Sequence, residues 1–110
     1  MKNYILVSIN LRFEAIHCWP ESPIEVGFLR NPHRHIFHVT MKWPVAHVDR
    51  DIEFILKKRQ VEEYVNLKWH RKDIGRLSCE DIALELIREF QGCCFVSVLE
   101  DGENGAEVYL

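Results

Sequence analysis

The histidines at positions 33 and 35 stand in a stretch that alternates like a β-strand, and this alternation constrains the fold more than any other feature. Apolar residues continue it at every second position from Phe37 to Trp43. Successive side chains of a strand point to opposite faces, so both histidines share a face with these apolar residues. The pattern predicts a strand over residues 33–43 with one buried face and two imidazoles at its start.

Three further strands are predicted from the same period of two. Residues 2–16 carry apolar side chains at alternate positions and form the strand that precedes the histidines. Residues 18–32 contain three prolines and predict a loop between the two strands. Residues 94–100 and 106–110 alternate again on either side of a turn that contains two glycines.

The first helix is predicted over residues 49–65, where apolar residues recur at helical spacing. Asp49 or Asp51 can cap it, because acidic groups suit the first turn of a helix. Ile55 and Leu56 are expected on its buried face.

The second helix is predicted over residues 78–91, opened by a capping box of Ser78 and Asp81. The order is then strand, strand, helix, helix, strand, strand. Grouped strands and helices predict an α+β domain, in which two antiparallel hairpins form one four-stranded sheet with both helices on one face.

The composition is that of one ordinary globular domain over residues 1–110. Apolar residues make up 47% and charged residues 28%, and the net charge is -3 without a basic block, so the sequence predicts no nucleic-acid partner. No apolar run is long enough to span a bilayer, and the amino terminus lacks the pattern of a signal peptide. A cytoplasmic protein with four reduced cysteines is expected.

A third histidine, His17, directly follows the first predicted strand and lies near His33 and His35 if the two strands pair. Three histidines around one zinc ion leave a coordination position open, as in a catalytic zinc site. The alternative is three unrelated histidines, some buried and hydrogen-bonded. Spacing alone favours that alternative, because the sequence has no short-spaced zinc motif.

Four motifs in order shift the balance toward zinc. The chain resembles the 6-pyruvoyl-tetrahydropterin synthase and 6-carboxy-tetrahydropterin synthase family, which has the T-fold. Residues 13–17 match Phe-x-Ala-x-His, and residues 33–39 match His-Gly-His-x-Tyr/Phe-x-Val with arginine in place of glycine. Residues 77–83 resemble the Pro-Thr-Ser-Glu-Asn-Ile-Ala segment, and residues 96–100 match Val-x-Val-x-Glu.

The resemblance implies a role for each matched residue. His17, His33 and His35 would be the zinc ligands. Glu100 would recognise a pterin, because a carboxylate can accept two parallel hydrogen bonds from a ring N–H and an amino group. Glu80 would help to frame the same pocket. Family members form barrels from rings of subunits, a hexamer of two trimeric rings, so a homo-oligomer is expected.

The sequence also departs from the family. Phe28, Leu29 and Arg30 stand where the family's catalytic cysteine is expected, and no Asp-His pair occurs between the helices. Cys18 and His70 are the candidates to replace them in proton transfer. A loop histidine without a catalytic role is an equal alternative for His70, and a partly buried cysteine without one is the favoured alternative for Cys18.

Three hypotheses for the function follow. The first is a zinc-dependent enzyme that acts on dihydroneopterin triphosphate or a related pterin, with the carboxy branch, which feeds 7-deazaguanine (queuosine) synthesis, as first choice. In it, zinc would hold the substrate's side-chain hydroxyls and lower their pKa. The second is a binder of a pterin or purine-like ligand that has lost synthase activity. The third is an interaction module whose histidines bind no metal.

Overall fold

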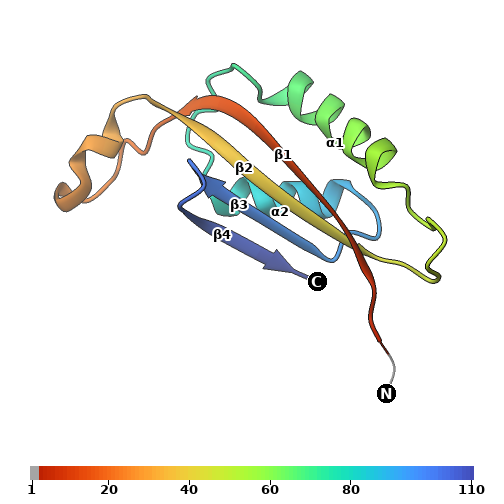
Figure 1. The fold of residues 1–110 in the computed structure, drawn as a ribbon. Helices are drawn as coiled ribbons and strands as arrows, with labels where there is room; N and C mark the ends of the chain where they lie inside the picture. Colours follow the sequence, from red (N-terminus) through yellow and green to blue (C-terminus); the bar gives the residue numbers. More distant parts are fainter. Residues whose placement is uncertain (1–2) are drawn as a thin grey trace.

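Four antiparallel strands form one sheet, and they follow one another across it in chain order (Figure 1). They are β1 (Leu6–His17), β2 (His33–Pro44), β3 (Phe95–Glu100) and β4 (Asn104–Tyr109). This computed structural model describes residues 3–110, so residue 2, the predicted start of the first strand, lies outside the described residues. The α+β class and the four-stranded antiparallel sheet are confirmed.

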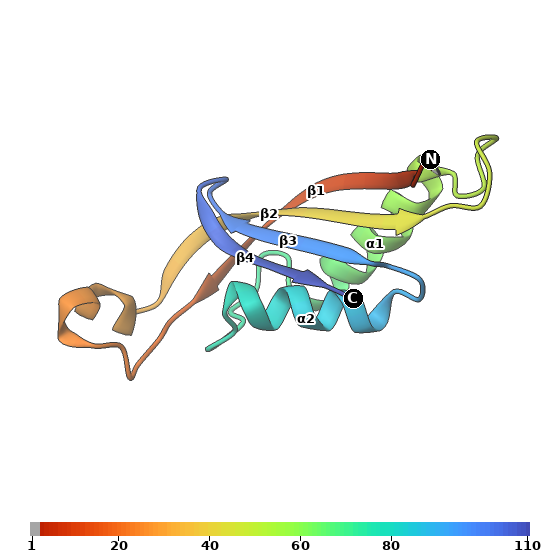
Figure 2. The same ribbon diagram turned by 90° about the horizontal axis from the view of Figure 1, so that it is seen from below.

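Two α-helices, α1 (Phe54–Lys68) and α2 (Cys79–Glu89), pack on the sheet between β2 and β3 in the chain. α1 contacts β1, and α2 contacts β3 and β4 (Figure 2). One buried cluster joins Val61 and Val65 of α1 and Ile82 and Leu86 of α2 to the apolar face of the strands. Removing this face from water is the main favourable term in the stability of the fold. Within residues 3–110, neither helix combines the length and apolar character that a membrane crossing needs.

The predicted start of the first helix is wrong. α1 begins at Phe54, and the Glu53 side chain caps it by accepting a hydrogen bond from the Ile55 amide at 3.1 Å. Asp51 is not available as a cap, because its carboxylate accepts from the Ala46 amide in the preceding turn. The predicted buried face is also wrong, because the residues of α1 that are buried are Val61 and Val65, whereas Ile55 and Leu56 are exposed.

The predicted capping box of α2 is confirmed. The Ser78 hydroxyl accepts from the Asp81 amide at 3.1 Å, and the Asp81 carboxylate accepts from the Ser78 amide at 3.0 Å. Two amides that the helix itself leaves without partners are thereby satisfied. α2 is shorter than predicted and ends at Glu89, and its buried residues face the sheet.

We expect Ser78→Ala to lower the free energy of unfolding by about 1 kcal/mol, because it leaves the Asp81 amide without its acceptor. Urea unfolding measured by circular dichroism gives this value. Ser8→Ala, on the exposed face of β1, is the matched control. A loss no larger than that of the control would contradict the capping role.

The segment between β1 and β2 was predicted to be a loop, and the structure shows that it also contains helical turns. It contains a short 3-10 segment, η1 (Ile24–Arg30), which is interrupted at Val26 and buries none of its residues. η1 projects from the end of the β1–β2 hairpin, away from the helices (Figures 1 and 2). η1 therefore lies at the same end of the hairpin as the histidines (Figure 1).

Candidate metal centre

The pairing of β1 with β2 brings the three predicted histidines together. His17 lies directly opposite His33 in the ladder, and His35 lies opposite Ala15. Because all three face the same side of the sheet, their rings gather at one point. The ring centroids are 4.6 Å apart for His17 and His33, 5.3 Å for His17 and His35, and 5.0 Å for His33 and His35.

One nitrogen of each ring is already hydrogen-bonded to an oxygen at 2.7–2.8 Å, and in every case it is Nδ1. The oxygens are the Leu77 carbonyl for His17, the Asn31 carbonyl for His33 and the Asp101 carboxylate for His35. Carbonyl and carboxylate oxygens only accept, so each Nδ1 donates and each neutral ring keeps its lone pair on Nε2. Metal-binding histidines in proteins are oriented in the same way.

The remaining nitrogens have the properties of metal ligands. Nε2 of His17 and Nε2 of His35 are buried without a hydrogen-bond partner among the residues described. One nitrogen from each of the three rings lies within 4.8 Å of the other two. Buried polar atoms in proteins are normally hydrogen-bonded, and these two face the Glu100 carboxylate at ion-pair distance without a hydrogen bond, so each can take a ligand. The three histidines can hold a metal ion, and zinc as its identity stays a prediction.

Glu100 lies directly beside the histidine group. It is paired with Phe37 in the β2–β3 ladder, which turns its side chain to the histidine face. Its Oε1 is 3.4 Å from Nε2 of His17, and its Oε2 is 3.2 Å from Nε2 of His35. The carboxylate is about one third exposed. It therefore contacts the histidine group and also reaches solvent.

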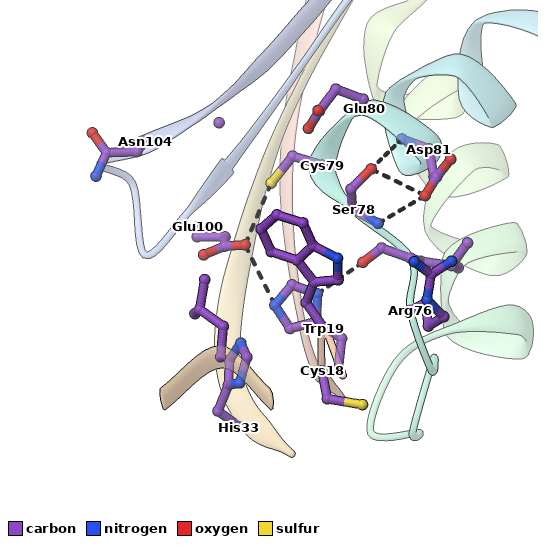
Figure 3. Close-up of a pocket in the computed structure, with 14 residues that line it drawn as sticks. Cys18, Trp19, His33, Arg76, Ser78, Cys79, Glu80, Asp81, Glu100 and Asn104 are labelled. Carbon is purple, nitrogen blue, oxygen red and sulfur yellow. Dashed lines mark hydrogen bonds and ion pairs between the residues drawn. The ribbon is translucent and has the colours of Figure 1, made fainter. Parts of the chain in front are cut away.

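A pocket of about 460 Å³ opens beside this group, between the strand ends and the start of α2. Figure 3 shows His33, Glu100 and Cys79 on its walls, with Cys79 directed toward Glu100. Among the predicted site residues, the pocket is lined by His17, His33, Glu100, Glu80 and Cys18.

Cys79 is a pocket residue that the sequence interpretation did not single out. It is the first residue of α2, and its thiol donates a 3.8 Å hydrogen bond to Glu100 Oε1. Burial, with the negative charges of Glu100 and Glu80, raises the pKa of the Cys79 thiol to about 12. Cys79 is thus a neutral hydrogen-bond donor near pH 7 and not a thiolate nucleophile.

His70 does not join the histidine group of its own chain. Its Nδ1 accepts a hydrogen bond from the Glu14 amide at 3.2 Å, at the outer edge of β1. It lines a second hollow with Arg12 and His38. The sequence could not reveal this, because residues 69–77 follow no regular period.

Asp101 is the other contact that sequence reasoning missed. Its carboxylate binds Nδ1 of His35 at 2.7 Å, and hydrogen bonds from the Ile36 amide and then His35 hold the pKa of Asp101 below its usual range. An acid directly after the predicted ligand-binding residue Glu100 was the available signal. It was overlooked because Asp-Gly in a turn is already explained by turn chemistry.

Comparison with known proteins adds no relative. No protein-family model matches the chain, and no curated protein matches its sequence. The likeness to the tetrahydropterin synthases therefore stays an expectation that depends on the residues themselves. The geometry of the histidine group stands independently of that likeness.

Proposed function

We propose that this chain is a zinc-dependent enzyme of the tetrahydropterin synthase type, acting on dihydroneopterin triphosphate or a related pterin. The observation that carries the proposal is the convergence of one ring nitrogen from each of three histidines beside a partly exposed carboxylate, at the edge of a pocket. His17, His33 and His35 would hold the zinc ion. When bound there, zinc supplies a Lewis acid that polarises substrate oxygens.

Glu100 would bind the pterin ring. A carboxylate presents two acceptor oxygens, which suit the adjacent ring N–H and amino group of a 2-amino-4-oxo-pyrimidine. The Cys79 thiol donates to one of these oxygens and holds the carboxylate in the pocket. Glu80, on the wall of the pocket, would frame the ring.

Proton transfer in this reaction needs a side chain that takes and returns protons. Of the two predicted candidates, Cys18 lines the pocket and His70 lies at the edge of β1. In an oligomer with sites between chains, as the family resemblance implies, His70 would act from a neighbouring copy. We propose such a homo-oligomer, because β4 and the part of β1 before Glu14 lie at the edges of the sheet, where association would pair them, whereas residues 14–18 already pair with residues 71–75.

Two observations favour a second candidate function, a pterin or purine binder without synthase activity. His70 is not part of the histidine group of its own chain, and Cys79 is held as a thiol. Without a group that takes and returns protons, the pocket can bind a ligand but cannot complete the reaction.

Incubation with dihydroneopterin triphosphate separates the two functions. We expect the zinc-loaded protein to release inorganic triphosphate, measured by ion chromatography, and the His33→Ala variant to release none above background. Tight pterin binding without triphosphate release would contradict the enzyme and support the binder. Absence of both binding and release would contradict both.

A further inference from the structure

The three histidines differ in the group that accepts the hydrogen bond from Nδ1. His17 and His33 donate Nδ1–H to neutral backbone carbonyls, whereas His35 donates to the carboxylate of Asp101. A hydrogen bond to an ionised acceptor is about twice as strong as one between neutral groups. It also makes the opposite nitrogen of the ring a better electron donor. Among the three rings, His35 is therefore the one whose Nε2 is the strongest electron donor to a cation.

Asp101 is itself held rigidly against β2. Its amide donates to the Ile36 carbonyl at 2.7 Å, and its Oδ1 accepts from the Ile36 amide at 3.0 Å. This reciprocal pair leaves Oδ2 for His35. The backbone of Asp101 is in the left-handed region, at φ 54°. Asp and Asn tolerate that region better than most residues, so the turn selects a short side chain with an oxygen acceptor here.

We propose that Asp101 is a positioning residue of the metal site. It fixes the His35 ring with the proton on Nδ1 and Nε2 turned to the metal, and it raises the metal affinity of the site. The inference rests on the metal site of the proposed function and not on the pterin. Asp101 directly follows Glu100. The two hydrogen bonds between Asp101 and Ile36 therefore also help to position the carboxylate that faces His35.

Asp101→Asn tests this role. Asn fits the left-handed backbone and keeps an oxygen for the Ile36 amide, but it removes the charge beside His35. Loss of such a partner typically lowers metal affinity about 10-fold to 100-fold. We expect this loss in competition for Zn²⁺ with a chromophoric chelator, without any pterin present. Glu103→Gln, at an exposed acid in the same turn, should bind Zn²⁺ like the wild type.

A second measurement does not depend on the variant folding. Long-range proton–nitrogen NMR of the unsubstituted protein identifies which nitrogen of His35 carries the proton. We expect Nδ1, with a mixture of tautomers in Asp101→Asn. A proton on Nε2 of the unsubstituted protein, or Zn²⁺ affinity of Asp101→Asn within about twofold of wild type, would overturn the proposal. Failure of pterin binding or turnover would leave both results unchanged and would count only against the proposed function.

Discussion

His33→Ala is expected to abolish the binding of one zinc ion per chain. The variant removes one of three nitrogens that converge at the site, and two imidazoles leave the ion without enough protein ligands for a zinc centre. The loss should exceed the roughly 100-fold that removal of a partner outside the ligand set can cost. Elemental analysis after dialysis gives the stoichiometry, and chelator competition gives the affinity.

His33 is the best of the three positions for this test. His33 is only half-buried and is the first residue of β2. His17 is buried, and its loss would leave a cavity in the fold. His38→Ala is the matched control, because His38 is on the same strand and faces the opposite side of the sheet. Equal zinc content in the two variants would show that the histidine group does not hold the metal.

The sheet could be predicted well from the sequence, and the reason is physical. A strand with one buried face must alternate, and a shift of one residue would turn every apolar side chain to water. The histidines take part in the same alternation, so the face that they share was predictable once β1 and β2 were expected to pair. That they converge needed one further fact, the register that sets His17 opposite His33.

Helix boundaries and irregular segments were predicted less well. The start of α1 is decided by whether an acid caps the helix or binds a turn, and Asp51 binds the turn. Two acids a few residues apart cannot be distinguished by spacing alone. η1 has no apolar period, because it buries none of its residues. The position of His70 at the edge of β1 likewise follows from a long-range backbone contact and not from a local pattern.

The residues of the candidate metal site were predicted from the sequence. The groups that hydrogen-bond to those residues and hold them in place were not. Patterns of residue type reveal side chains, whereas the Leu77 carbonyl that fixes His17 is a backbone group with no sequence signal. Cys79 was missed for a related reason, since its position toward Glu100 depends on where α2 begins relative to β3. Hydrogen-bond partners of this kind can be identified only once the positions of the helices and strands in space are known.

Glu100→Gln is expected to weaken pterin binding by about 10-fold to 100-fold. The carboxylate can accept two parallel hydrogen bonds from the pterin ring, whereas an amide offers one acceptor and sets its NH₂ group against a donor. Hydrogen bonds to charged groups are worth about 1.5–3 kcal/mol each, and 1.4 kcal/mol corresponds to a factor of ten in the dissociation constant. Isothermal titration with a stable pterin, such as neopterin, measures the change.

Zinc content decides how that result is interpreted. Glu100 is 3.2 Å from Nε2 of His35 and 3.4 Å from Nε2 of His17, so its substitution could act on the metal instead of the ring. We expect Glu100→Gln to keep zinc at the wild-type level while it loses pterin affinity. Glu80→Gln, in the same pocket and away from the histidines' nitrogens, should keep its zinc as well and lose less pterin affinity. Unchanged pterin binding in Glu100→Gln would refute the ring contact, because the amide cannot accept both hydrogen bonds from the ring.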